Sequence, residues 1–198
     1  MFEYNKKLQY PVKIDRPNPR LASVIISQYG GPDGELGASL RYLSQRYSMP
    51  FDELKGLLTD IGVEELNHLE MVGAIIHQLT RNLKDSQIQD SAFAPYFVDH
   101  TTGVYPQFAS GTPWTAATMQ VKGDPITDLS EDLAAEQKAR TTYDNILRLS
   151  DDPDVNNVIK FLRQREIVHF QRFGEAMQLL REKLNQKNVY CMNPAIDI

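Results

Sequence analysis

The sequence predicts an all-α fold, a four-helix bundle with a long crossover between its second and third helices. Two long stretches place apolar residues at alternating steps of three and four, which is the spacing of one helical face. Proline-marked breaks divide the helical stretches into two pairs. The 198 residues, with 41% hydrophobic and 24% charged side chains, suit one domain with a substantial core.

The chain is expected to begin with an extended arm over residues 1–19, because residues 10–19 contain three prolines that forbid a continuous helix. The bundle is expected over residues 20–186. Its first helix begins near Arg20, and the glycine-rich residues 30–34 predict either a break or a loosened turn. A phosphate-binding loop is disfavoured there, because no Lys-Ser/Thr pair follows and no strand precedes.

Two short links predict two antiparallel helical hairpins. Pro50 ends the first long helix, and the second helix begins there and runs to about Arg81. Residues 151–153 form the second short link, between a third helix near 127–149 and a fourth near 154–185.

The crossover, residues 83–124, is rich in proline, glycine, serine and threonine and carries scattered aromatic residues. A helix of about 20 residues is roughly 30 Å long, so this segment can return along the whole bundle. Its aromatic residues suggest either a cover over the bundle or a contact between subunits. A short C-terminal tail, residues 187–198, is expected to extend over a surface or a neighbour.

Glu65 and His68 stand one helical turn apart on the apolar face of the second predicted helix. Glu166 and His169 repeat this arrangement in the fourth helix, and Glu35 and Glu136 stand 30 residues before each pair. The offsets 0, 7, 30 and 33 define a repeat of Glu, Tyr, Glu and His, and the two copies are 101 residues apart. Its members are Glu35, Tyr42, Glu65, His68, and Glu136, Tyr143, Glu166, His169.

Four carboxylates on apolar stripes need a cation, because a buried charge costs several kcal/mol unless it is paired or bound to a metal. Buried ion pairing without metal is the less favoured interpretation. One inward carboxylate from each of two helices and one Glu-x-x-His from each of the others is the arrangement of ferritin-like di-iron and di-manganese bundles. Oxygen donors with imidazole favour manganese or iron over structural zinc, and the sole thiol, Cys191, lies in the tail. Peroxide or dioxygen is the natural substrate class, and hydrolysis is less attractive.

The sequence resembles the manganese catalases, and among them the short members of bacterial spore coats. The resemblance covers nearly the whole chain and is carried by residues 7–10, 30–35, 42–45, 57–62, 64–65, 68–70, 113–114, 165–166 and 169. It implies a dimanganese centre that cycles between the (II,II) and (III,III) states and dismutates hydrogen peroxide to oxygen and water. It also implies a homo-oligomer, a hexamer.

By position, the resemblance implies that Glu35, Glu65 and His68 bind one metal and that Glu136 and His169 bind the other, with Glu65 bridging. Glu166 would handle protons beside the metals, whereas a ferritin-like di-iron site would use the equivalent group as a ligand. Some family members carry an arginine directly before the third-helix glutamate, but here that position is Ala135. Activity is expected to be lower for that reason. The protein is also expected to differ from larger members in having no long C-terminal extension after the fourth helix.

Several neighbouring residues are assigned supporting or no roles. Tyr42 and Tyr143 share the ligand face and either hydrogen-bond a ligating carboxylate or simply pack in the core. Glu64 and Glu70 are expected to be solvated or to act as hydrogen-bonded supports. No ligand spacing includes His77 or His100, which are expected at the surface or in a loop. Arg163 and Arg165 are expected on a solvated helix face.

The net charge of −5 and the pI near 5.4 argue against nucleic acid as a partner. The longest N-terminal apolar run, residues 21–26, is too short to span a membrane, and no signal-peptide core follows the first residues. Synthesis in the cytoplasm without a signal peptide is expected, with the spore coat as the location that the resemblance implies. Two rival functions stay open: a ferritin-like di-iron oxidase or ferroxidase, and a mainly structural coat protein with a residual metal site.

Overall fold

The computed structural model describes residues 7–184, and in these residues the elements are helices and loops with a single isolated β-bridge, between Gln107 and Pro113. The long helices are α1 (Pro19–Gly30), α2 (Glu35–Gln45), α3 (Asp52–Thr80), α6 (Pro125–Leu149) and α7 (Pro153–Lys183), joined by the shorter η1 (Arg46–Ser48), α4 (Asp85–Gln89), α5 (Ala94–His100) and η2 (Ala116–Thr118). The predicted all-α bundle is confirmed. The predicted C-terminal tail lies outside the described residues.

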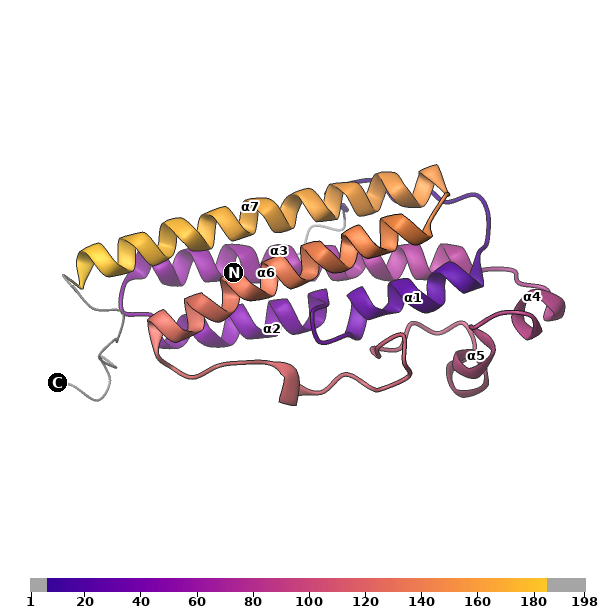
Figure 1. Cartoon of the computed structure of the whole chain (residues 1–198), viewed down its shortest axis with the longest axis horizontal. Helices are drawn as coiled ribbons and strands as arrows, with labels where there is room; N and C mark the ends of the chain where they lie inside the picture. The colour runs from indigo at the N-terminus through magenta and orange to yellow at the C-terminus, as the bar shows by residue number, and fades with distance from the viewer. Residues whose placement is uncertain (1–6, 185–198) are drawn as a thin grey trace.

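Four rods make the bundle, with α1 and α2 following one another along the first rod (Figure 1). The chain then runs back through α3, returns along the crossover, and forms the second hairpin from α6 and α7. Contacts are most extensive within each hairpin, between α2 and α3 and between α6 and α7. The two predicted hairpins and the long return are therefore confirmed.

The helix starts follow the capping signals in the sequence. Asp124 and Asp152 each accept a hydrogen bond from a backbone N–H in the first turn of the helix that follows, and Asn18 does the same for α1. A proline follows each of these caps at the first helical position, where its missing N–H has no cost. The first rod ends earlier than expected, because α2 stops at Gln45 and the tighter turn η1 precedes Pro50.

The first rod is broken rather than loosened at the glycine-rich residues. α1 ends at Gly30 and α2 begins at Glu35, with Gly34 as its N-cap. At Gly30 an added Cβ would lie only 2.4 Å from the backbone of Pro106 and Gln107 in the crossover. The crossover therefore touches the rod so closely at this point that only glycine fits.

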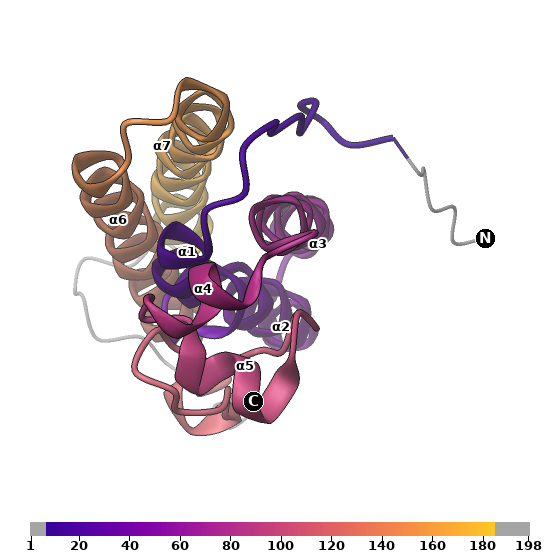
Figure 2. The ribbon, with the colours of Figure 1, turned by 90° about the vertical axis from the view of Figure 1, so that its right-hand side faces the viewer.

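The crossover packs along α1 and α2 and contains the unpredicted helices α4 and α5 (Figure 2). The amide of Ala109 donates to Ser27 Oγ, and the side-chain amide of Gln45 donates to the carbonyl of Gln120. Phe93 and Tyr96 stack on each other and join the apolar core. The crossover therefore covers one side of the bundle, which is one of its two expected roles.

The described part of the N-terminal arm, residues 7–18, is extended and runs along the side that α3 and α7 share (Figure 2). Gln78 of α3 accepts from the amide of Ile14 and donates to the carbonyl of Val12. Tyr10 stacks on Phe161 of α7 with ring centroids 5.1 Å apart. The arm therefore contacts both helices, and its described part has the predicted extended conformation.

The apolar core forms two clusters rather than one. One cluster joins α1, the second half of α3, the end of α6 and the start of α7, and includes Tyr143. The other joins α2, the first half of α3, the start of α6 and the end of α7, and includes Tyr42. The two helical faces that the sequence predicts, the seams of α3 and α7, are buried at every position. They comprise Leu54, Leu58, Ile61, Glu65, His68, Val72, Ile75 and Leu79 in α3, and Ile159, Leu162, Glu166, His169, Phe173, Ala176 and Leu180 in α7. Over the described residues, none of the helices has the length and apolar character of a membrane span.

Candidate metal centre

Six ionisable side chains meet between the two apolar clusters, and each is at most 2% exposed. They form two groups that overlap in Glu65 and Glu166, and within each group one oxygen or nitrogen atom per residue lies within 4.8 Å of the others. One group adds Glu35 and His68, and the other adds Glu136 and His169. The structure thus brings together all six predicted site residues.

The helices place these groups by their register. Glu65 and His68 belong to the buried seam of α3, and Glu166 and His169 belong to that of α7. Glu136 lies in the middle of α6, whereas Glu35 is the first residue of α2. The break in the first rod therefore puts the Glu35 carboxylate at a helix N-terminus, where the helix dipole favours negative charge.

Glu65 lies between the two imidazoles. Its Oε2 lies 2.7 Å from Nδ1 of His68, and its Oε1 lies 2.7 Å from Nδ1 of His169. Both Nδ1 atoms thus face the carboxylate cluster, while the two rings stack with centroids 5.6 Å apart. One carboxylate from α3 touches the histidines of both hairpins.

The donor set fits a pair of divalent cations. Glu166 Oε1 has no hydrogen-bond partner, and the ring nitrogens of His169 meet oxygens of Glu64, Glu65 and Glu136 only as ion-pair contacts, without a hydrogen bond. Such atoms are costly in a protein core unless protons or cations compensate them. Carboxylate oxygens with one imidazole per group suit manganese or iron, and no cysteine belongs to either group.

Two tyrosines tie the halves of the repeat to each other. The hydroxyl of Tyr42 in α2 donates to Glu136 in α6, and the hydroxyl of Tyr143 in α6 donates to Glu35 in α2. Both tyrosines are fully buried. Of the two roles left open by the sequence, the structure shows the hydrogen bond to a cluster carboxylate at both positions.

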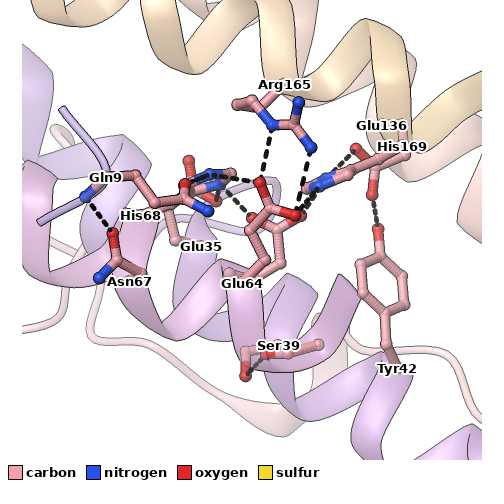
Figure 3. Close-up of polar contacts among 12 residues, drawn as sticks. Gln9, Glu35, Ser39, Tyr42, Glu64, Asn67, His68, Glu136, Arg165 and His169 are labelled. Carbon is pink, nitrogen blue, oxygen red and sulfur yellow. Dashed lines mark hydrogen bonds and ion pairs between the residues drawn. The ribbon is translucent and has the colours of Figure 1, made fainter. Parts of the chain in front are cut away.

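The outer nitrogens of the histidines face a second carboxylate, that of Glu64 (Figure 3). Its two oxygens lie 3.5 Å from Nε2 of His68 and 3.1 Å from Nε2 of His169. Arg165 donates to the same oxygens at 2.7 and 3.3 Å. From the arm, Gln9 Oε1 lies 3.0 Å from Nε2 of His68. The expectation that Glu64 is a support is thus confirmed.

Burial and mutual charge perturb every group in this network. Burial is the largest cause that raises the pKa of Glu35, Glu136 and Glu166, and neighbouring carboxylates raise it further. Burial also acts on Glu65, but the two imidazoles hold its pKa well below the ordinary value.

The pKa values of the two histidines are raised, and the pKa of Glu64 is lowered. Burial would lower the pKa of His68, but the carboxylates around it raise this pKa to about 9, and they raise the pKa of His169 further. Burial opposes the shift of Glu64, whose contacts with His169, His68 and Arg165 hold its pKa well below the ordinary value. The carboxylates thus favour the charged form of both imidazoles, which offsets part of the charge of the cluster.

The expectation for Arg165 is wrong, because this residue is part of the network rather than of a solvated face. Arg163 is likewise held, by an ion pair of 2.8 Å with Asp144. The repeat itself carries a signal for Arg165, since Glu64 and Arg165 are 101 residues apart and directly precede the repeated glutamates. Gln9 had no such signal, because its contact with His68 joins residues 59 apart.

Of the remaining histidines, His77 matches the expectation, whereas His100 is half-buried and belongs to a helix rather than a loop. His77 is exposed on α3. His100 lies at the end of α5, where its ring stacks on Tyr105 at 4.0 Å between centroids. Neither belongs to either of the groups that could hold a metal ion.

Three buried polar side chains near Tyr42 were not predicted from the sequence. Arg41, Gln45 and Asp132 are all at most 1% exposed, and each has side-chain atoms without a hydrogen-bond partner. Asp132 precedes Glu136 by one turn of α6, and burial raises its pKa well above the ordinary value. Arg41 lies with its guanidinium carbon 6.0 Å from the centre of the Tyr42 ring. A buried arginine is thus present near the site although position 135 is alanine.

Comparisons with known proteins agree with this geometry. The chain is 50% identical to Protein CotJC of Bacillus subtilis over 190 residues, which are 96% of this chain and all of that relative. It is 34% identical to a probable manganese catalase of Clostridium acetobutylicum, over 95% of this chain and 84% of the relative. The crystal structure of KatB, a manganese catalase from Anabaena PCC7120, matches with a TM-score of 0.87 and 33% identity, over 98% of this chain and 87% of that one. The family model for manganese containing catalase matches residues 1–192, so the chain belongs to the manganese catalase family.

Proposed function

We propose that this protein is a dimanganese catalase that dismutates hydrogen peroxide to water and oxygen. The observation that carries the proposal is the pair of buried ligand groups that share Glu65 and Glu166 at the centre of a bundle from this family. The similarity to KatB, a manganese catalase, supports manganese as the metal.

Glu35, Glu65 and His68 would hold one ion, and Glu136 and His169 would hold the other. Glu65 would serve both, since its two oxygens already face the two histidines. Bound manganese would supply the redox chemistry, because the two ions together would hold the two electrons released by one peroxide until the next peroxide is reduced.

The reaction also needs protons to be stored. Oxidation of one peroxide to oxygen releases two protons and two electrons, and reduction of the next peroxide to two waters consumes both. Glu166 is proposed to accept and return one of these protons, because its carboxyl group belongs to both ligand groups and lies one turn from His169, and the other proton would pass to solvent held at the site. The burial of all six groups keeps bulk water away from this exchange.

The test is to prepare the protein with manganese and to measure its metal content and the oxygen it releases from peroxide. We expect two ions per chain and oxygen release, and we expect Glu65→Ala and His169→Ala to lose both. His77→Ala, which changes an exposed histidine of α3, is the matched control and should keep both. Oxygen release that survives in the Glu65 and His169 variants would contradict the proposal.

Iron is the alternative metal, because the oxygen and imidazole donors accept both ions. Elemental analysis of the protein as isolated, followed by peroxide and ferrous-oxidation assays with each metal, separates a catalase from a di-iron oxidase or ferroxidase. Manganese in the isolated protein and oxygen release only with manganese would support the catalase.

Location and assembly are also proposed. The match over the full length of Protein CotJC supports a short spore-coat-type member that assembles as a homo-oligomer, a hexamer by the resemblance, with other coat proteins as further partners. Light scattering of the purified protein measures the oligomer. A metal-free variant that still enters a normal coat would instead favour a mainly structural role.

A further inference from the structure

We propose that Glu64, held by Arg165, is a positioning residue shared by the two metal positions, so that one carboxylate orients both histidine ligands and couples binding of the two ions. This inference rests on the proposed metal site. It concerns atoms on the outer side of the histidines, opposite the nitrogens that face the cluster.

The contacts place Glu64 between the two rings. Its oxygens lie 3.5 and 3.1 Å from the Nε2 atoms of His68 and His169, while the Nδ1 atoms of both rings lie 2.7 Å from Glu65. A carboxylate beside Nε2 attracts a proton to that nitrogen. The lone pair of each ring is then left on Nδ1, which is the nitrogen that faces the cluster.

Arg165 fixes the carboxylate itself. It donates to both oxygens of Glu64, which is a two-point contact that sets the plane of the carboxylate as well as its position. The Glu64 side chain is only 12% exposed and that of Arg165 is 29% exposed, so water screens the pair only partly. The pair also joins the hairpins, because Glu64 lies in α3 and Arg165 in α7.

Gln9 provides a comparison inside the same protein. Its side-chain oxygen contacts Nε2 of His68 at 3.0 Å, and its backbone N–H donates to Oδ1 of Asn67, so the arm supports one ring. Support from Gln9 therefore belongs to one metal position, whereas support from Glu64 belongs to both. This difference separates coupling from a general loss of structure.

The experiment measures manganese binding to the metal-free full-length protein by competition with a chelator. For Glu64→Gln we expect the affinity of both positions to fall by about 10–100-fold, as is typical when a partner of a metal-binding histidine is removed. For Gln9→Ala, which changes support at His68 alone, we expect a smaller fall in the overall affinity for the two ions, which should still bind as a pair. Arg172→Gln is the matched control on α7, since Arg172 contacts the exposed Asp60 at 3.6 Å, and it should leave both unchanged.

Electron paramagnetic resonance gives a second readout, because an isolated manganese(II) ion and a magnetically coupled pair have different spectra. With less than one equivalent of manganese, we expect the wild-type protein to fill pairs and Glu64→Gln to hold isolated ions. Arg165→Gln leaves Glu64 in place and carries the test if Glu64→Gln does not fold. It should also weaken both positions together.

Wild-type affinity at both positions in Glu64→Gln, or loss at one position only, would overturn the inference, and so would wild-type binding by Arg165→Gln. Binding is measured before peroxide is added. A wild-type protein that binds two ions but releases no oxygen would contradict the proposed function and leave this inference intact.

Discussion

The hydroxyl group of Tyr143 makes a single hydrogen bond to a carboxylate of the candidate metal centre. It is fully buried in α6 and donates to Glu35 across the bundle. In Tyr143→Phe the carboxylate of Glu35 loses a donor, but the aromatic packing is kept. We expect the overall affinity for the manganese pair to fall by about 10–100-fold, because the position of Glu35 and His68 is weakened.

Tyr47→Phe is the control for this change, because its hydroxyl lies on the surface and accepts from Arg46. Binding of manganese to both proteins is measured by isothermal titration. Equal affinities in Tyr143→Phe and the wild-type protein would show that the contact with Glu35 is packing alone.

At the scale of elements, the close contact between α1 and the crossover predicts the effect of one added methyl group. In Gly30→Ala the new Cβ would meet the backbone of Pro106 and Gln107, which cannot move aside as a flexible side chain can. We expect the free energy of unfolding to fall by about 1–3 kcal/mol, the usual cost of overpacking. Urea denaturation monitored by circular dichroism measures it.

Gly56→Ala is the matched control within α3, since nothing lies within 4 Å of a Cβ added there. Alanine has the higher helix propensity, so this variant should be more stable by about 0.5–1 kcal/mol. If Gly30→Ala is as stable as Gly56→Ala, the crossover does not hold α1 at Gly30.

The sequence predicts the long elements well because their signals are local. Apolar spacing locates α3 and α7, and the prolines and aspartates before α6 and α7 locate their starts within two residues. The sequence leaves open whether residues 30–34 break the first rod, because that depends on the contact with the crossover. The helices α4 and α5 are only 5 and 7 residues long, too short for a periodic pattern.

The site residues also fall into those with a local sequence signal and those without one. The six cluster residues follow from spacing and from the repeat, because one helical turn fixes which side chains share a face. Arg165 was misplaced because its side chain lies at the edge of the buried seam, half-buried rather than inward. The contribution of Gln9 depends on how the arm docks on α3 and α7, and no local pattern encodes this.

For the whole molecule, the shifted groups predict how the metal-free protein responds to pH. The pKa of His68 is raised to about 9, that of His169 is raised further, and the pKa values of three cluster carboxylates are also raised, namely Glu35, Glu136 and Glu166. A group whose pKa is higher in the folded state stabilises the fold below its unfolded pKa, and this stability is lost as pH rises through the folded pKa.

We therefore expect the Tm of the metal-free protein to fall as pH rises from about 5 to about 9, through the range set by these groups. Glu64 and Glu65 have lowered pKa values, so their stabilisation is present above about 4.5 and is lost only in more acidic solution. Differential scanning calorimetry at a series of pH values measures this. A Tm that rises over this range would contradict the charge balance described for the cluster.

Manganese should change this dependence. Metal ligands bind in their deprotonated form, so binding releases protons and becomes more favourable at higher pH. The difference in Tm between manganese-loaded and metal-free protein should therefore increase with pH under oxygen-free conditions. An increase that also occurs in His169→Ala would show that the ion acts elsewhere on the molecule.

The pairing of Glu64 with Arg165 has a consequence for the symmetry of the bundle. These residues stand at the same place in the two copies of the repeat, and they meet each other across the centre. If two identical hairpins associated by two-fold symmetry, any residue at this place would meet its own twin, and a charged one would meet a like charge. Because both copies lie in one chain with different residues at this place, the contact is an ion pair of opposite charges, which a dimer of identical hairpins could not form.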